Sequence, residues 1–152
     1  MIKKIVKYLL CLLPWFITSI LPLNYAYYNK IIKPTFAPPP IFYGIAWSII
    51  YILIAYTIFI ILENYKLDEI PKSYKKTLII NYIFNQAFTI VFFGFNNNFL
   101  GFASCLGTLL STLFLFEETN TLINKKKYFL IPYVLLSIFA CILSLSIYLL
   151  NI

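Results

Sequence analysis

Long and almost uncharged apolar stretches are the feature that most constrains the fold of this chain. Five of them can be distinguished, each 18 to 23 residues long, and together they make up about two thirds of the 152 residues. A helix needs about 20 apolar residues to cross the hydrocarbon core of a bilayer, so each stretch has the length of one membrane span. The expected spans are residues 5–23, 41–62, 77–95, 99–116 and 128–150.

Composition excludes the main alternatives to a helical membrane protein. Residues are 62% hydrophobic and only 11% charged, whereas a soluble domain carries about 25% charged residues to cover its surface. The apolar stretches are continuous and lack the alternation of polar and apolar residues that a membrane β-barrel requires. We therefore expect an all-α integral membrane protein, with residues 1–152 forming a single domain built as a five-helix transmembrane bundle.

The lysines predict the orientation of this bundle. Of the twelve, ten fall on the N-terminal side of the expected spans, and only Lys30 and Lys33 fall on the opposite side. Because cytoplasmic loops are enriched in basic residues, we expect a bacterial cytoplasmic membrane, with the N-terminus in the cytoplasm and the C-terminus outside. This placement also explains the pI of about 9.3 without a nucleic acid partner. The ten lysines are Lys3, Lys4, Lys7, Lys66, Lys72, Lys75, Lys76, Lys125, Lys126 and Lys127.

The interior of the expected spans is uncharged, which narrows the functions available. No Asp, Glu, Lys or Arg lies in the middle of a span, which argues against a proton-coupled pump and a charge-lined pore. The chain has no His, and Cys11, Cys105 and Cys141 lie far apart within apolar stretches. We expect these cysteines to be small packing residues, and we expect neither a metal site nor a required cofactor.

Neutral polar residues are concentrated in the third expected span, which contains Asn81, Asn85, Gln86 and Thr89. An amide in hydrocarbon is costly unless it is hydrogen-bonded, so these side chains should point into the bundle. They would serve either as hydrogen bonds between helices or as contacts to a ligand. Small residues in the fourth and fifth spans favour close helix packing, and some of them suit a homodimer: Gly101, Cys105, Thr108, Thr112, Ser137, Ala140, Cys141 and Ser144.

The connection at residues 24–40 is the longest between spans and contains four prolines among several aromatic residues. Proline fixes the backbone and biases the preceding residue to extended conformations, so this loop should be stiff. Tyr25, Tyr27 and Tyr28 also suit an aromatic belt at the membrane surface, but a belt does not explain the prolines. We expect the loop to be a lid over a cavity in the bundle.

Several short motifs follow one another along residues 24–151. Each motif alone is weak evidence for a family, but the ordered set is strong evidence. Along the loop and the second, third and fifth spans the motif residues are Tyr28, Lys33, Pro34, Phe36, Pro38 and Pro39; Tyr43, Gly44, Trp47 and Tyr51; Asn81, Asn85, Phe88, Thr89, Phe92 and Phe93; and Leu130, Ile131, Pro132, Tyr133, Ala140 and Asn151. This ordered set resembles the translocator protein family, also called the tryptophan-rich sensory protein or peripheral-type benzodiazepine receptor family (TspO/MBR).

The resemblance implies a five-helix membrane protein that binds tetrapyrroles. We therefore expect a binding protein or sensor for protoporphyrin IX and similar flat lipophilic ligands, with a role in regulation or transport. The porphyrin would be a ligand of this protein and not a required cofactor. Lys30 or Lys33 would meet a propionate at the mouth of the site. The expected ligand-binding residues are Tyr28, Pro38, Trp47, Tyr51, Asn85, Gln86, Phe88, Leu136, Ala140 and Ser144.

Departures from the family pattern bear on the alternative functions. The family usually has Trp where this chain has Tyr27, Phe88 and Leu136, and the pocket tryptophans are implicated in light-dependent porphyrin breakdown. A photo-oxidative enzyme is therefore a less favoured alternative, as are a downhill carrier of lipophilic solutes and a protein whose polar stripes serve packing alone. No basic residue follows Tyr148, so the C-terminus does not support sterol binding.

Overall fold

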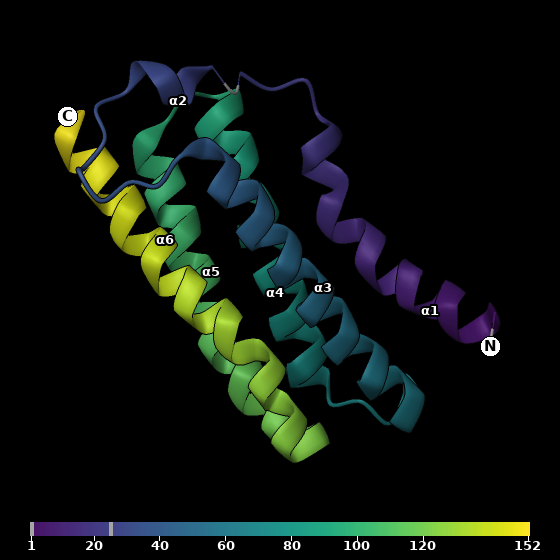
Figure 1. The fold of residues 1–152 in the computed structure, drawn as a ribbon. Coiled ribbons are helices and arrows are strands. Elements are labelled where there is room, and N and C mark those ends of the chain that lie inside the picture. Colours follow the sequence, from purple (N-terminus) through teal and green to yellow (C-terminus); the bar gives the residue numbers. More distant parts are fainter. Residues whose placement is uncertain (1, 25) are drawn as a thin grey trace.

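The computed structural model describes residues 2–24 and 26–152, apart from the side chain of Lys125, and this part of the chain is helical without strands (Figure 1). The expectation of an all-α fold is confirmed. The tyrosine at position 25, for which we weighed an aromatic belt against a lid, lies outside the described residues. The elements are α1 (Ile2–Leu12), η1 (Leu13–Ile20), α2 (Tyr27–Lys30), α3 (Pro40–Asn64), α4 (Lys72–Thr89), η2 (Ile90–Gly94), α5 (Asn98–Ile123), η3 (Asn124–Leu130) and α6 (Ile131–Leu150).

Four helical segments in the described part of the chain are long and apolar enough to cross a membrane. They are Pro40–Asn64, Lys72–Gly94, Asn98–Ile123 and Lys126–Leu150, and they correspond to the last four expected spans. The first expected span, residues 5–23, is instead divided into α1 and the 3₁₀ helix η1, with Pro14 at the start of η1. Proline lacks an N–H and clashes with the carbonyl four residues earlier, so an α-helix cannot continue regularly through it. Four of the five expected spans are therefore confirmed as helices long enough to cross a membrane in the described part of the chain, and the count of five is not confirmed.

Prolines and asparagines mark where the long helices begin and end. Pro40 opens α3, and Pro132 lies in the first turn of α6, where the missing N–H costs nothing because it would be unpaired anyway. Asn97 caps α5 by accepting a hydrogen bond from the Leu100 N–H at 2.9 Å. Asn124 ends α5 with a φ of 46°, in the left-handed region that asparagine tolerates better than most residues.

The helices pack with their polar faces inward. α4 packs on α5, α5 on α6, and α3 on both α5 and α6, while α1 lies along α3 and η1 contacts α4 (Figure 1). α5 buries Ser104, Thr108 and Thr112, whereas Leu110 and Phe114 on the same helix are exposed. In a soluble protein the apolar side chains are buried and the polar ones exposed. The opposite distribution here suits a protein whose outer surface contacts lipid.

The two termini lie at opposite ends of the bundle (Figure 1). The α3–α4 connection and η3 lie at the N-terminal end, so the segments with ten lysines gather there, while the segment with α2 lies at the C-terminal end. At the N-terminal end α1 is fastened to α3 through Glu63, whose carboxylate pairs with Lys4 at 3.0 Å and with Lys7 at 2.8 Å. Lys7 also donates to the Leu62 carbonyl at 2.6 Å.

Glycine substitutions test the packing of η2 against α5. A Cβ placed at Gly101 would lie 2.8 Å from Cδ2 of the buried Phe92 ring, whereas a Cβ at Gly44 would have no atom within 4 Å. We expect Gly101→Ala to lower the free energy of unfolding by about 1–3 kcal/mol through overpacking. Gly44→Ala should instead raise it by about 0.5–1 kcal/mol, because alanine is the better helix former. Thermal unfolding of both variants in detergent micelles measures the difference, and equal effects would contradict the packing.

Candidate functional site

The end of α4 widens into a π-helical turn, η2, and this turn brings three phenylalanines together. The Phe88 and Phe92 rings stack with centroids 5.2 Å apart and planes 16° apart, and Phe93 meets Phe92 edge-on at 4.9 Å. π-helical turns inside α-helices occur often at functional sites, because the extra residue redirects side chains. All three rings line one cavity.

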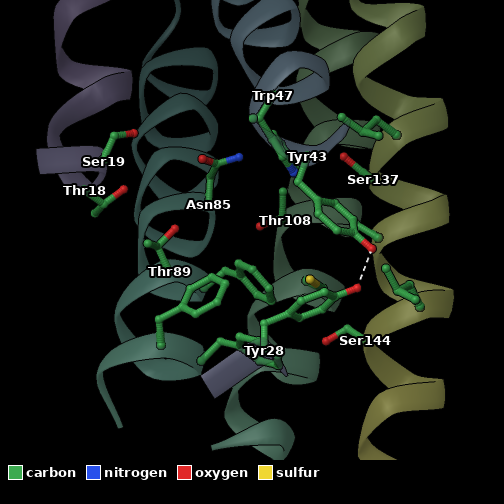
Figure 2. Close-up of a pocket in the computed structure, with 18 of the residues that line it drawn as sticks. Thr18, Ser19, Tyr28, Tyr43, Trp47, Asn85, Thr89, Thr108, Ser137 and Ser144 are labelled. Atoms are coloured by element: carbon green, nitrogen blue, oxygen red, sulfur yellow. Dashed lines mark hydrogen bonds between the residues drawn. The ribbon is translucent and has the colours of Figure 1, made fainter. Parts of the chain in front are cut away.

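This cavity has a volume of about 610 Å³ and lies among α3, α4, α5 and α6, with η1 and α2 contributing to its wall (Figure 2). Ligand pockets typically measure about 300–1,000 Å³ and combine apolar walls with a few polar groups. The residues found in its lining are uncharged. Its aromatic residues are Phe16, Tyr28, Tyr43, Trp47, Tyr51, Phe88, Phe92, Phe93 and Phe139, and its polar ones include Thr18, Ser19, Asn29, Ser48, Asn85, Thr89, Thr108, Ser137 and Ser144.

Aromatic rings form much of the cavity wall. The Trp47 ring lies 5.9 Å from the Tyr51 ring and 6.1 Å from the Tyr133 ring. One turn earlier on α3, Tyr43 meets Tyr28 edge-on at 5.7 Å, and their hydroxyls share a hydrogen bond of 2.9 Å (Figure 2). Tyr28 comes from the loop, so this hydroxyl pair joins the loop to α3.

A buried hydrogen-bond network lies beside the cavity and begins at Asn81, which is fully buried. Its amide nitrogen lies 2.9 Å from Thr112 Oγ1 and 3.0 Å from Ser111 Oγ, and donates to both. Its amide oxygen accepts from the Tyr133 hydroxyl at 2.8 Å. Asn81 therefore holds α4 to α5 and α6, which is the helix-bonding role that we weighed against a ligand-contact role.

Asn85, one turn further along α4, belongs both to the network and to the cavity wall. Its nitrogen donates to the Tyr133 hydroxyl at 3.3 Å, and its oxygen accepts from the Tyr51 hydroxyl at 3.0 Å. Gln86 donates to the same oxygen at 3.2 Å. The Asn85 side chain is therefore held in one orientation before any ligand arrives.

Eight of the ten expected site residues line the cavity: Tyr28, Trp47, Tyr51, Asn85, Phe88, Leu136, Ala140 and Ser144. Gln86 does not, because the next residue of a helix is rotated by about 100° and points here toward η1. There it accepts from the Thr18 hydroxyl at 2.8 Å and donates to the Trp15 carbonyl at 3.2 Å. Pro38 also lies outside the lining; it precedes α3 in the extended part of the loop, and Pro40 at the helix start lines the cavity instead.

Several lining residues were not expected. Ser137, Cys105 and Thr108 had been assigned to helix packing, although Ser137 shares the helix spacing of Ala140 and Ser144 and could have been included on that basis. Phe16, Thr18 and Ser19 come from η1, and no motif indicated that the first span reaches the cavity. The Ser137 hydroxyl is buried and has no hydrogen-bond partner in the described part of the structure.

The connection at residues 26–39 contains the short helix α2 and contributes Tyr28 and Asn29 to the cavity wall. Lys33 does not extend from it toward a ligand. Its ammonium donates to the Tyr28 carbonyl at 2.8 Å and to the Ile31 carbonyl at 3.1 Å, and it lies 4.9 Å from the centroid of the Tyr28 ring. Lys33 therefore stabilises the loop through these contacts, whereas the Lys30 side chain is exposed.

Comparison with known proteins agrees with this architecture. The sequence model of the TspO/MBR family matches residues 7–150. The chain is 36% identical over 138 residues to the tryptophan-rich protein TspO of Bacillus cereus, covering 90% of this chain and 89% of the relative. It is 32% identical over 126 residues to the uncharacterized membrane protein YtaB of Bacillus subtilis, covering 83% and 81%. It is 29% identical over 129 residues to the tryptophan-rich protein TspO of Archaeoglobus fulgidus, covering 82% and 80%.

Removing one hydroxyl tests the network. Tyr133→Phe leaves the buried Asn81 oxygen and the Asn85 nitrogen without the partner they share, and a buried unpaired polar group costs about 1–3 kcal/mol. We expect the free energy of unfolding to fall by that amount in thermal or denaturant unfolding. Tyr8→Phe is the matched control, since its hydroxyl donates to the Ile52 carbonyl at 3.2 Å at an exposed position. A loss no larger for Tyr133→Phe than for Tyr8→Phe would argue against the network.

Proposed function

This chain belongs to the TspO/MBR family, and from that premise we propose that it is a membrane binding protein for tetrapyrroles such as protoporphyrin IX and related flat lipophilic molecules. The observation that carries the proposal is the cavity of about 610 Å³, whose walls are aromatic and uncharged. A flat macrocycle gains affinity from burying apolar surface and from offset or edge-on contacts with aromatic rings.

The arrangement of the walls suggests how such a ligand would lie. Trp47 and Tyr51 on α3 face the cavity from one side, and the stacked pair Phe88 and Phe92 faces it from α4 and η2. Asn85 would orient the ligand through its amide, which the network already holds in place. Because the amide is already fixed in the free protein, ligand binding does not have to order this side chain, and no conformational entropy is lost there on binding.

The charges of a tetrapyrrole would lie outside the cavity. An uncharged lining cannot compensate a buried carboxylate, so propionates would extend past the loop toward water and toward Lys30. We propose that this mouth faces the outside of a bacterial cytoplasmic membrane, with the lysine-bearing N-terminal end of the bundle in the cytoplasm. A role as a sensor is consistent with the expected spans, which contain no Asp, Glu, Lys, Arg or His at mid-depth for coupling transport to an ion gradient.

A titration with protoporphyrin IX on the purified protein in detergent micelles tests the proposal. We expect the Soret band of the porphyrin to shift on binding, and we expect the double variant Trp47→Phe, Asn85→Ala to lose at least about tenfold in affinity through lost ring contact and lost orientation. Because the readout is the absorbance of the porphyrin, it does not depend on the replaced tryptophan.

Trp15→Phe is the control for this titration. Trp15 is buried but lies outside the cavity lining, so the affinity should stay near that of the unmodified protein. The chain has two tryptophans, so in this variant any fluorescence quenching comes from Trp47. Undiminished binding by the Trp47→Phe, Asn85→Ala variant would place the ligand elsewhere and overturn the proposed site.

A further inference from the structure

Asn151, just after α6, holds the middle of the loop that covers the cavity. Its amide nitrogen donates to the Ile32 carbonyl at 2.8 Å, and its amide oxygen accepts from the Ile32 N–H at 2.9 Å. The same nitrogen donates to the Ile147 carbonyl in the last turn of α6 at 2.7 Å. One side chain therefore satisfies both backbone groups of a loop residue and ties them to α6, which lines the cavity. In Figure 1 the C-terminal end of α6 lies beside the connection that follows α2.

The loop residues next to this contact reach the cavity wall. Ile31 is 9% exposed and belongs to a cluster of buried residues with Tyr28, Phe92 and Ile147. Three of these, Tyr28, Phe92 and Ile147, line the cavity. A displacement of Ile32 would therefore pull Ile31 from this cluster and loosen the wall that Tyr28 forms.

Hydrogen bonds within the segment from Tyr28 to Lys33 connect its two ends, so we expect it to move as a unit. Lys33 bonds to two carbonyls within the segment, those of Tyr28 and Ile31. On the N-terminal side the chain is attached separately, since the Asn24 N–H donates to the Phe93 carbonyl at 3.2 Å and the Tyr27 hydroxyl donates to Asn98 at 3.0 Å. Asn24 and Tyr27 thus anchor the chain before the segment, while Asn151 and the Tyr28–Tyr43 hydroxyl pair hold the segment itself.

We propose that Asn151 is a latch that keeps the Tyr28–Lys33 segment closed over the cavity and sets the rates of ligand entry and release. Asn151 is a positioning residue, since it lies outside the cavity lining and acts through the loop. Its effect on ligand rates rests on the proposed function, whereas the latch itself rests on the contacts above. A primary amide suits this role because it presents a donor and an acceptor side by side to the N–H and C=O of one backbone residue.

Asn151→Leu tests the latch, because leucine has a similar size and offers neither a donor nor an acceptor. Stopped-flow mixing with protoporphyrin IX should show that the association and dissociation rate constants both rise by about tenfold, as two lost hydrogen bonds imply, with a smaller change in Kd. A purely structural defect would instead weaken binding without accelerating association.

Asn64→Leu is the matched control. Asn64 ends α3 and donates to the Ile60 carbonyl at 2.7 Å, which is the same kind of helix-end bond as the one from Asn151 to Ile147. Asn64→Leu should leave both rate constants unchanged. Equal acceleration in the two variants, or none in Asn151→Leu, would overturn the proposal that Asn151 controls access.

Amide hydrogen exchange of the ligand-free protein separates the latch from the proposed function. A peptide covering residues 28–33 should exchange faster in Asn151→Leu than in the unmodified protein, and should be unchanged in Asn64→Leu. Unchanged exchange in Asn151→Leu would overturn the latch even if protoporphyrin IX binds. If protoporphyrin IX does not bind the unmodified protein, the proposed function fails, and the exchange result alone decides whether Asn151 holds the loop closed.

Discussion

The hydrogen bond between the Tyr133 hydroxyl and the Asn81 oxygen, 2.8 Å long and fully buried, is the contact on which the rest of this structure depends. Within a membrane there is no water to satisfy an amide, so each polar group must find its partner inside the protein. From this bond the network continues through Asn85 to Tyr51 and through Gln86 to Thr18, and so links α4 with α3, α5, α6 and η1. In this way buried polar residues position the helices whose outer surfaces are apolar.

The cavity follows from the same constraint. Its uncharged lining avoids the large cost of burying a charge, and its polar groups are amides, phenols and hydroxyls, several of which already bond to the protein. What is left for a ligand is a set of aromatic surfaces in fixed positions, extended by the π-helical turn that presents Phe92 and Phe93. The loop contributes Tyr28 and Asn29 to the wall, and Lys33 serves the internal structure of the loop because its ammonium donates to two carbonyls nearby.

Much of this could be predicted because it depends on local sequence. Span lengths, the proline-rich loop and the inward direction of Asn81 and Asn85 follow from helix geometry and from the cost of polar groups in lipid. Gln86 and Pro38 lie outside the cavity lining, which the sequence did not indicate because motif order says which segments meet but not which way each side chain turns. The contribution of η1 was missed for a similar reason, since a residue of one span can line a cavity only if that span packs against it in space.

The sequence by itself determined that the chain is a helical membrane protein whose spans are polar inside only through neutral groups, because length, hydropathy and charge act over a few turns of helix. The order of its motif residues also determined which family it resembles. The tertiary structure alone decided that Asn81 bonds helices while Asn85 also faces a cavity, and that Asn151 meets Ile32 across 119 positions of the chain. These roles depend on contacts between distant segments, and such contacts exist only once all the helices have packed.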